Sequence, residues 1–212
     1  MNWRIKNNIS QEQVQNQSSV SPMYVTQESP IEGTDGISVI DNKVLFYSDI
    51  NSESCMGLNR ILLELDNKLQ SLKVDLGDEY SPIIHLHLHT HGGDVFAAFS
   101  TINTMSSLKS KVYTYIDGYV ASAGTIISCK GHKRFIGKYG YMMIHQLSGE
   151  MYGKFTEMED SFTDYSDLMK LLKRYYKKYT KIPMKKIDEI LKHDLSMSAE
   201  KCLEYGLIDQ IL

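Results

Sequence analysis

The sequence predicts an α/β fold, in which β-strands alternate with α-helices and the strands form a largely parallel sheet. Short apolar runs typical of strands are separated by longer segments whose apolar residues recur every three or four positions, as on one face of a helix. Strands that alternate with helices favour crossover connections between parallel neighbours. At 212 residues the chain is long enough for one domain with a sizeable core and some additional structure.

The predicted elements begin after a polar N-terminal segment. Residues 1–36 are rich in Asn, Gln and Ser, and such a stretch buries too little apolar area to offset its ordering entropy. We therefore expect a mobile segment or a propeptide there, and the folded domain over 37–212. Within the domain we predict strands at 42–47, 83–89, 112–117 and 141–145, and helices at 53–72, 95–108, 125–129, 157–180 and 183–192.

The predicted helix over 157–180 has a long apolar stripe. Its members recur at helical spacing: Met158, Phe162, Tyr165, Leu168, Leu172, Tyr175 and Tyr179. A stripe of this length indicates a core contact or a subunit interface, and not a cofactor site.

Composition excludes several classes of function. A net charge of -3 and a pI near 6.2 give no electrostatic basis for binding nucleic acid or an acidic membrane. No run of about 18 apolar residues occurs, and the N-terminus lacks the apolar stretch of a secretory signal. The basic residues within 130–138 are interpreted as a solvated loop beside a strand. Cys55, Cys129 and Cys202 lack metal-type spacing and are expected to be small buried or half-buried residues of a reducing, cytoplasmic compartment.

Four histidines alternate along the predicted strand at 83–89 and just beyond it. His85, His87, His89 and His91 would project from one face at intervals of roughly 7 Å. Neighbouring imidazoles could share a metal ion, but no acidic residue or Cys joins the set in sequence. We therefore expect half-exposed histidines without a metal, and no cofactor.

A Ser, a His and an Asp occur in the order of a nucleophile, its base and the group that orients the base. Ser122 is surrounded by small residues and precedes an apolar run that predicts a helix, His145 ends an apolar strand, and Asp194 follows a short helix. Taken singly, each has a common structural explanation: a helix cap, a satisfied polar residue and a turn residue. Only the combination favours a catalytic role.

Five motifs surround these residues along the chain: Thr90-His-Gly-Gly-Asp-Val95, Ala121-Ser-Ala-Gly124, Met143-Ile-His-Gln146, Asp194 before Ser198-Ala-Glu200, and Glu204-Tyr-Gly-Leu-Ile-Asp209. Together they resemble the motifs of the proteolytic subunit of the Clp protease. The similarity extends from about residue 42 to residue 212, with every motif in family order.

The resemblance implies a crotonase-like fold of repeated β-β-α units with a protruding handle helix at about 147–180. It implies a serine peptidase that cleaves unfolded polypeptides inside a homo-oligomeric ring, a heptamer that can stack, with Ser122, His145 and Asp194 as the catalytic residues. The backbone N–H groups of Gly93 and Ala123 would form the oxyanion hole. Substrate would be bound by Gly92, Leu147, Ser148 and Gly149, as a strand added along 147–153.

Several positions depart from the family pattern. His85 and His87 stand where the family has tyrosines of a pocket that docks an unfoldase ATPase, so that partner is left open. Leu147 replaces a proline, and Lys192-His193 replaces an Asp-Arg pair that links stacked rings. Two other functions are therefore considered: a viral-type processing protease that acts without an ATPase, and a catalytically silent ring subunit. A crotonase-type acyl-CoA enzyme is a more distant alternative, because its chemistry does not require all three residues.

Overall fold

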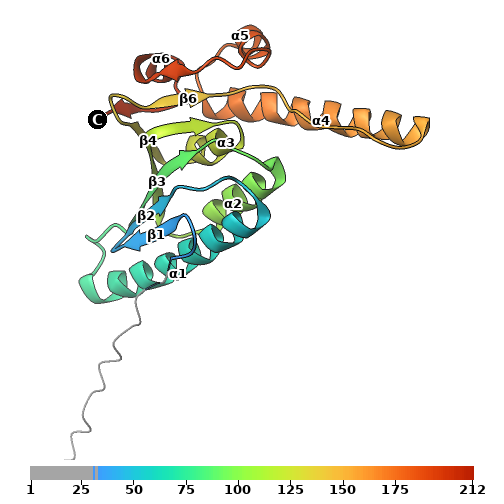
Figure 1. Cartoon of the computed structure of the whole chain (residues 1–212). Helices are drawn as coiled ribbons and strands as arrows, with labels where there is room; N and C mark the ends of the chain where they lie inside the picture. The colour runs from blue at the N-terminus through green and yellow to red at the C-terminus, as the bar shows by residue number, and fades with distance from the viewer. Residues whose placement is uncertain (1–30, 32) are drawn as a thin grey trace, which may run out of the picture. The chain divides into compact units, whose positions relative to one another are not determined.

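The computed structural model describes residues 31 and 33–212 (Figure 1). The expected mobile segment or propeptide at 1–36 lies almost entirely outside the described residues. Within them, the strands are β1 (Ile37–Ile40), β2 (Lys43–Phe46), β3 (Ile83–Thr90), β4 (Lys111–Ala121), β5 (Lys133–Ile136), β6 (Tyr141–Met143), β7 (Met197–Ser198) and β8 (Gln210–Ile211). The helices are α1 (Ser52–Leu76), α2 (Val95–Ser107), α3 (Ala123–Cys129), α4 (Phe155–Tyr179), α5 (Met184–Ile190) and α6 (Ala199–Glu204).

The strands form one mixed sheet in the order β1-β2-β3-β4-β5-β8. The pairs from β2 through to β8 are parallel, and β1 pairs with β2 in the antiparallel direction. The long strand β4 also pairs with β6 in parallel, and β6 carries β7 on its other side. The predicted α/β class with parallel crossovers is therefore confirmed for the main part of the sheet.

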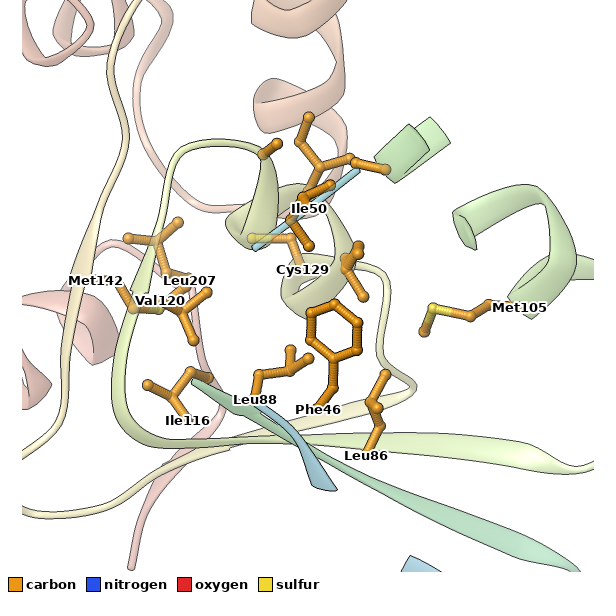
Figure 2. Packing of buried hydrophobic residues seen from close by; sticks show 14 of the residues in the cluster. Phe46, Ile50, Leu86, Leu88, Met105, Ile116, Val120, Cys129, Met142 and Leu207 are labelled. Carbon is orange, nitrogen blue, oxygen red and sulfur yellow. The ribbon is translucent and has the colours of Figure 1, made fainter. Parts of the chain in front are cut away.

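The core lies between the sheet and the helices that follow β2, β3 and β4. Alternate strand residues are fully buried, and Figure 2 shows Phe46 of β2 with Leu86 and Leu88 of β3 beside Cys129 of α3. Helix α1 begins with a capping box in which Asn51 and Ser54 satisfy each other's backbone N–H groups. The three cysteines are free and buried, as predicted.

One predicted loop is a strand. Residues 133–136 form β5, and Arg134, at 13% side-chain exposure, forms an ion pair with Asp209. Its guanidinium also donates to the carbonyl oxygens of Tyr179 and Gly206. The interpretation of this basic cluster as a solvated loop was wrong here, because the acid that neutralises Arg134 lies 75 residues away in sequence.

Helix α4 is divided into a buried and an exposed half. Leu172, Tyr175 and Tyr176 are buried near its C-terminal end, whereas Phe155 and Phe162 near its N-terminal end are exposed. Figure 1 shows the N-terminal half of α4 extending beyond the sheet. No helix in the described part of the chain is both long enough and apolar enough to cross a membrane.

The alternating histidines of β3 contact side chains of β4. Asp117 accepts hydrogen bonds from the His87 Nδ1 and from the Tyr47 hydroxyl, at 2.9 and 2.6 Å. His85 Nδ1 lies 2.8 Å from the hydroxyl of Tyr115. An acidic residue therefore does join the histidines, which the sequence did not indicate. Among the described residues, no group of three or more His, Cys, Asp or Glu side chains is placed to hold a metal ion.

Candidate active site

Ser122 lies at the junction between β4 and α3 in a strained backbone conformation. Its φ of 52° and ψ of -127° are unusual for a residue with a side chain, and such geometry costs on the order of 1–3 kcal/mol. Ser122 occupies the N-cap position of α3, yet its side chain makes no capping hydrogen bond. The hydroxyl is therefore turned away from the helix, and the helix-cap explanation does not account for this serine.

The turn between β3 and α2 brings two glycines close to Ser122. A Cβ on Gly92 would lie 2.6 Å from the Ser122 Cβ and 3.1 Å from the Ala123 nitrogen. A Cβ on Gly93 would lie 2.1 Å from the carbonyl oxygen of Ile50, to which the Asp94 N–H donates. Both glycines have positive φ angles, of 99° and 141°. A side chain at either position would overlap its neighbours, so only glycine fits where this turn approaches Ser122 and Ile50.

His145 is positioned by the strand that pairs beside Ser122. The Ser122 N–H donates to the carbonyl oxygen of Met143, the last residue of β6, at 2.8 Å. Two residues further on, the Nε2 of His145 lies 2.7 Å from the Ser122 Oγ. This is hydrogen-bond distance, so the imidazole can accept the hydroxyl proton when its Nε2 is unprotonated.

Asp194 approaches the other nitrogen of the same imidazole. Its Oδ1 lies 3.4 Å from the Nδ1 of His145, beyond an ordinary hydrogen bond. The Asp194 side chain is 77% exposed, whereas that of His145 is 21% exposed. The structure thus brings all three sequence-predicted side chains together, with a short Ser–His contact and a longer His–Asp contact.

Two backbone N–H groups near Ser122 have no acceptor within the described part of the chain. Among residues 31 and 33–212, no hydrogen-bond acceptor takes the N–H of Gly93 or of Ala123. Both residues line a cavity of about 210 Å³ together with Ser122 and His145. Ala123 is buried, where an N–H normally finds a partner, whereas Gly93 is exposed. Free donors of residues that line a cavity can serve an anionic oxygen.

The predicted substrate residues differ in whether they line this cavity. Leu147 and Ser148 line it. Gly92 packs against Ser122, and Gly149 packs against Tyr165 on α4. The Leu147 N–H donates to the Sδ of Met169 at 3.2 Å. Val95, Ile126, Leu168 and Leu172 give the cavity an apolar wall.

Two polar residues beside the site were not identified from the sequence. Thr125 Oγ1 donates to the Ser122 carbonyl oxygen, and the hydroxyl of Tyr176 lies 2.7 Å from the same Oγ1. Burial raises the pKa of Tyr176 above its usual value, so this phenol stays protonated at neutral pH. A threonine three residues after the serine was the only local signal, while Tyr176 fell within a segment interpreted as core or interface.

A comparison with family models gives a match over most of the chain. Residues 42–212 match the model described as Clp protease. Since the match covers more than half of the chain, the protein belongs to the Clp protease family. Family membership supports a peptidase, which is a hydrolase.

Proposed function

We propose that the protein is a serine endopeptidase that cleaves unfolded polypeptides or peptides through an acyl-enzyme. The observation that carries the proposal is the 2.7 Å contact between the Ser122 Oγ and the His145 Nε2. A serine in a strained conformation at a strand-to-helix turn, with its hydroxyl directed to an imidazole instead of its helix, is suited to nucleophilic attack.

The proposed reaction follows from the groups around Ser122. Its Oγ attacks the peptide carbonyl carbon while the His145 Nε2 takes the hydroxyl proton. The N–H groups of Gly93 and Ala123 stabilise the resulting oxyanion, and His145 then protonates the leaving amine. Water then attacks the acyl carbon while His145 takes a proton from it, and His145 returns that proton to the Ser122 Oγ as the acyl bond breaks. Asp194, facing the Nδ1, favours the required tautomer and stabilises the imidazolium.

The cavity supports an apolar side chain next to the cleaved bond. Val95, Ile126 and Leu172 form an apolar wall, and Asp94 also lines the cavity, so an aliphatic or small aromatic side chain is favoured over an acidic one. We propose that the substrate backbone runs along 147–153 as an added strand that contacts Leu147, Ser148 and Gly149. Gly92 would contribute to substrate binding through its close packing on Ser122.

The proposed assembly is a homo-oligomeric ring built on a crotonase-like fold of repeated β-β-α units. The exposed apolar side chains Phe155, Met158 and Phe162 of α4 support its role as a handle helix, at about 147–180, that packs between subunits. A heptameric ring, single or stacked, is the proposed stoichiometry. Lys192 and His193 are both basic, so these two positions do not supply the acid that an inter-ring ion pair needs. This favours single rings or double rings that dissociate readily.

An unfoldase ATPase is a weaker candidate as partner. At two positions where the resembled family has tyrosines, His87 is hydrogen-bonded to Asp117 and His85 contacts Tyr115. Polar groups at these positions reduce the apolar anchoring that dominates most interfaces. ATP-independent processing of peptides is therefore the second candidate function.

A fluorophosphonate probe tests the proposed function. We expect it to label the wild-type protein at Ser122, and Ser122→Ala to lose labelling and peptidase activity while remaining folded. Ser71→Ala is the matched control, because Ser71 is an exposed serine of α1 that bonds only the Asn67 carbonyl among the described residues. Equal labelling of wild type and Ser122→Ala would contradict the nucleophile assignment. A wild-type protein without labelling or turnover would favour the silent ring subunit.

A further inference from the structure

A buried hydrogen-bond chain connects α4 to the backbone of Ser122. Tyr176 of α4 and Thr125 of α3 are both buried, and their hydroxyl oxygens lie 2.7 Å apart. Thr125 Oγ1 lies in turn 2.7 Å from the Ser122 carbonyl oxygen. The chain therefore runs from a helix that extends away from the sheet to the proposed nucleophile.

The direction of the protons in this chain follows from its end point. A carbonyl oxygen can only accept, so the hydroxyl proton of Thr125 points to Ser122. Thr125 has no second hydroxyl proton, and Tyr176 must therefore donate to Thr125. The Thr125 N–H donates to the same Ser122 carbonyl oxygen at 3.0 Å. That carbonyl consequently receives two hydrogen bonds from one residue.

The Ser122 carbonyl shares a peptide plane with the Ala123 N–H. In a trans peptide the C=O and the N–H point in opposite directions, and the group is rigid. Hydrogen bonds that hold the Ser122 oxygen therefore also hold the direction of the Ala123 N–H. On the other side of the residue, the Ser122 N–H is held by Met143. The strained φ and ψ of Ser122 are thus constrained from both of its peptide groups.

We propose that Thr125 and Tyr176 are positioning residues that hold the Ser122–Ala123 peptide so that its N–H faces the developing oxyanion. This inference rests on the proposed function and adds two residues to it. Tyr176 also lines the cavity, but in the described residues its hydroxyl bonds Thr125, and the Thr125 hydroxyl bonds the Ser122 carbonyl oxygen and not the Ser122 Oγ. Their contribution is made mainly in the transition state, where the oxyanion forms, and much less in binding the ground state. The inference therefore predicts a loss of kcat with little change in KM.

The test compares hydroxyl deletions in steady-state peptide hydrolysis by the full chain. Complete removal of an oxyanion donor typically lowers the rate about a hundred- to a thousandfold. Because these substitutions only loosen the donor, we expect Tyr176→Phe to lower kcat about 10-fold and Thr125→Val about 30-fold, with KM within about twofold. Thr125→Ser keeps the hydroxyl and should restore most of the activity. Affinity for a peptide boronic acid, which forms a tetrahedral adduct, should fall in parallel with kcat.

Tyr175→Phe is the matched control. The Tyr175 hydroxyl also donates from α4 to α3, to the Ile126 carbonyl oxygen at the same distance of 2.7 Å, and it is also buried. Its removal should lower the melting temperature about as much as Tyr176→Phe but leave kcat within about twofold, because Ile126 does not belong to the Ser122–Ala123 peptide.

The outcomes separate the inference from the proposed function. An active wild-type protein in which Tyr176→Phe, Thr125→Val and Tyr175→Phe all have the same kcat would overturn the inference alone. The same holds if the losses appear in KM, or if Thr125→Ser is as impaired as Thr125→Val in kcat. A folded wild-type protein without peptidase activity would overturn both. Should Thr125→Val fail to fold, Tyr176→Phe against Tyr175→Phe still decides.

Discussion

Substitution of Gly93 by alanine tests whether the close approach of two backbone segments builds the site. The added Cβ would lie 2.1 Å from the Ile50 carbonyl oxygen, against the roughly 3.5 Å at which nonbonded heavy atoms attract each other. The clashing atoms belong to the backbone, so no side-chain rotation relieves the overlap. The chain must separate, which endangers the hydrogen bonds from Ile50 N–H to Gly92 and from Asp94 N–H to Ile50, both 2.8 Å long.

The expected loss of stability has two contributions, backbone strain at residue 93 and weakened hydrogen bonds. A side chain at a φ of 141° costs on the order of 1–3 kcal/mol, and two weakened hydrogen bonds add about 1–3 kcal/mol. We therefore expect Gly93→Ala to lower the free energy of unfolding by about 2–6 kcal/mol. Because Gly93 lines the cavity and its N–H is a proposed oxyanion donor, displacing it should also lower peptide turnover at least about a hundredfold.

The assay is urea unfolding at fixed protein concentration, together with peptide hydrolysis. Gly77→Ala is the control, because Gly77 also has a positive φ, of 84°, but a Cβ there would meet no atom within 4 Å. It should carry only the backbone strain, about 1–3 kcal/mol, and keep full turnover. If the two variants were equally stable and equally active, the packing of Gly93 on Ile50 would not be what shapes the site.

Three further predictions concern an ion pair, the thiols and the exposed acid. Although partial burial alone would raise it, hydrogen bonds from Arg134 hold the pKa of Asp209 below its usual value. This stabilisation is complete above the unfolded pKa of about 3.9 and is lost as the pH falls through the lower folded pKa, so Asp209→Asn should flatten the acid limb of a melting-temperature profile. Burial raises the pKa of Cys129 to about 11 and of Cys202 to about 12, so a disulfide reagent at pH 8 should label neither until the protein is unfolded. Asp194→Asn should lower peptide turnover at least about a hundredfold without changing the melting temperature, and near-normal turnover would remove Asp194 from the mechanism.

The sequence predicted the elements that have a long apolar period. The helix expected at 53–72 is present as α1, and the helix expected after Ser122 is α3. The strands β7 and β8 were missed because two residues carry no periodicity. Strand β5 was missed because its charged residues resemble a loop, and the partner of Arg134 is remote in sequence. Local patterns do not report such long-range pairing.

The three candidate catalytic residues were predicted from the order of their motifs. The contacts that hold these residues in place were not predicted. Ser122 and His145 were paired on that order, and they lie 2.7 Å apart. The distance of Asp194 and the roles of Thr125 and Tyr176 depend on how α3, α4 and the segment after α5 pack together. Asp117 was likewise missed beside the histidines because it lies on the neighbouring strand, 30 residues from His87.

The hydrogen bond from the Ser122 N–H to the Met143 carbonyl makes the spacing between Met143 and His145 a fixed length. Two residues after this bond, the Nε2 of His145 lies 2.7 Å from the Ser122 Oγ, so the two-residue spacing sets where the imidazole is held. Inserting one residue between them would turn the imidazole to the opposite side while leaving β6 paired with β4. Insertions in the segment before α4, by contrast, would leave this spacing unchanged. Change in length is therefore tolerated on one side of His145 and excluded on the other.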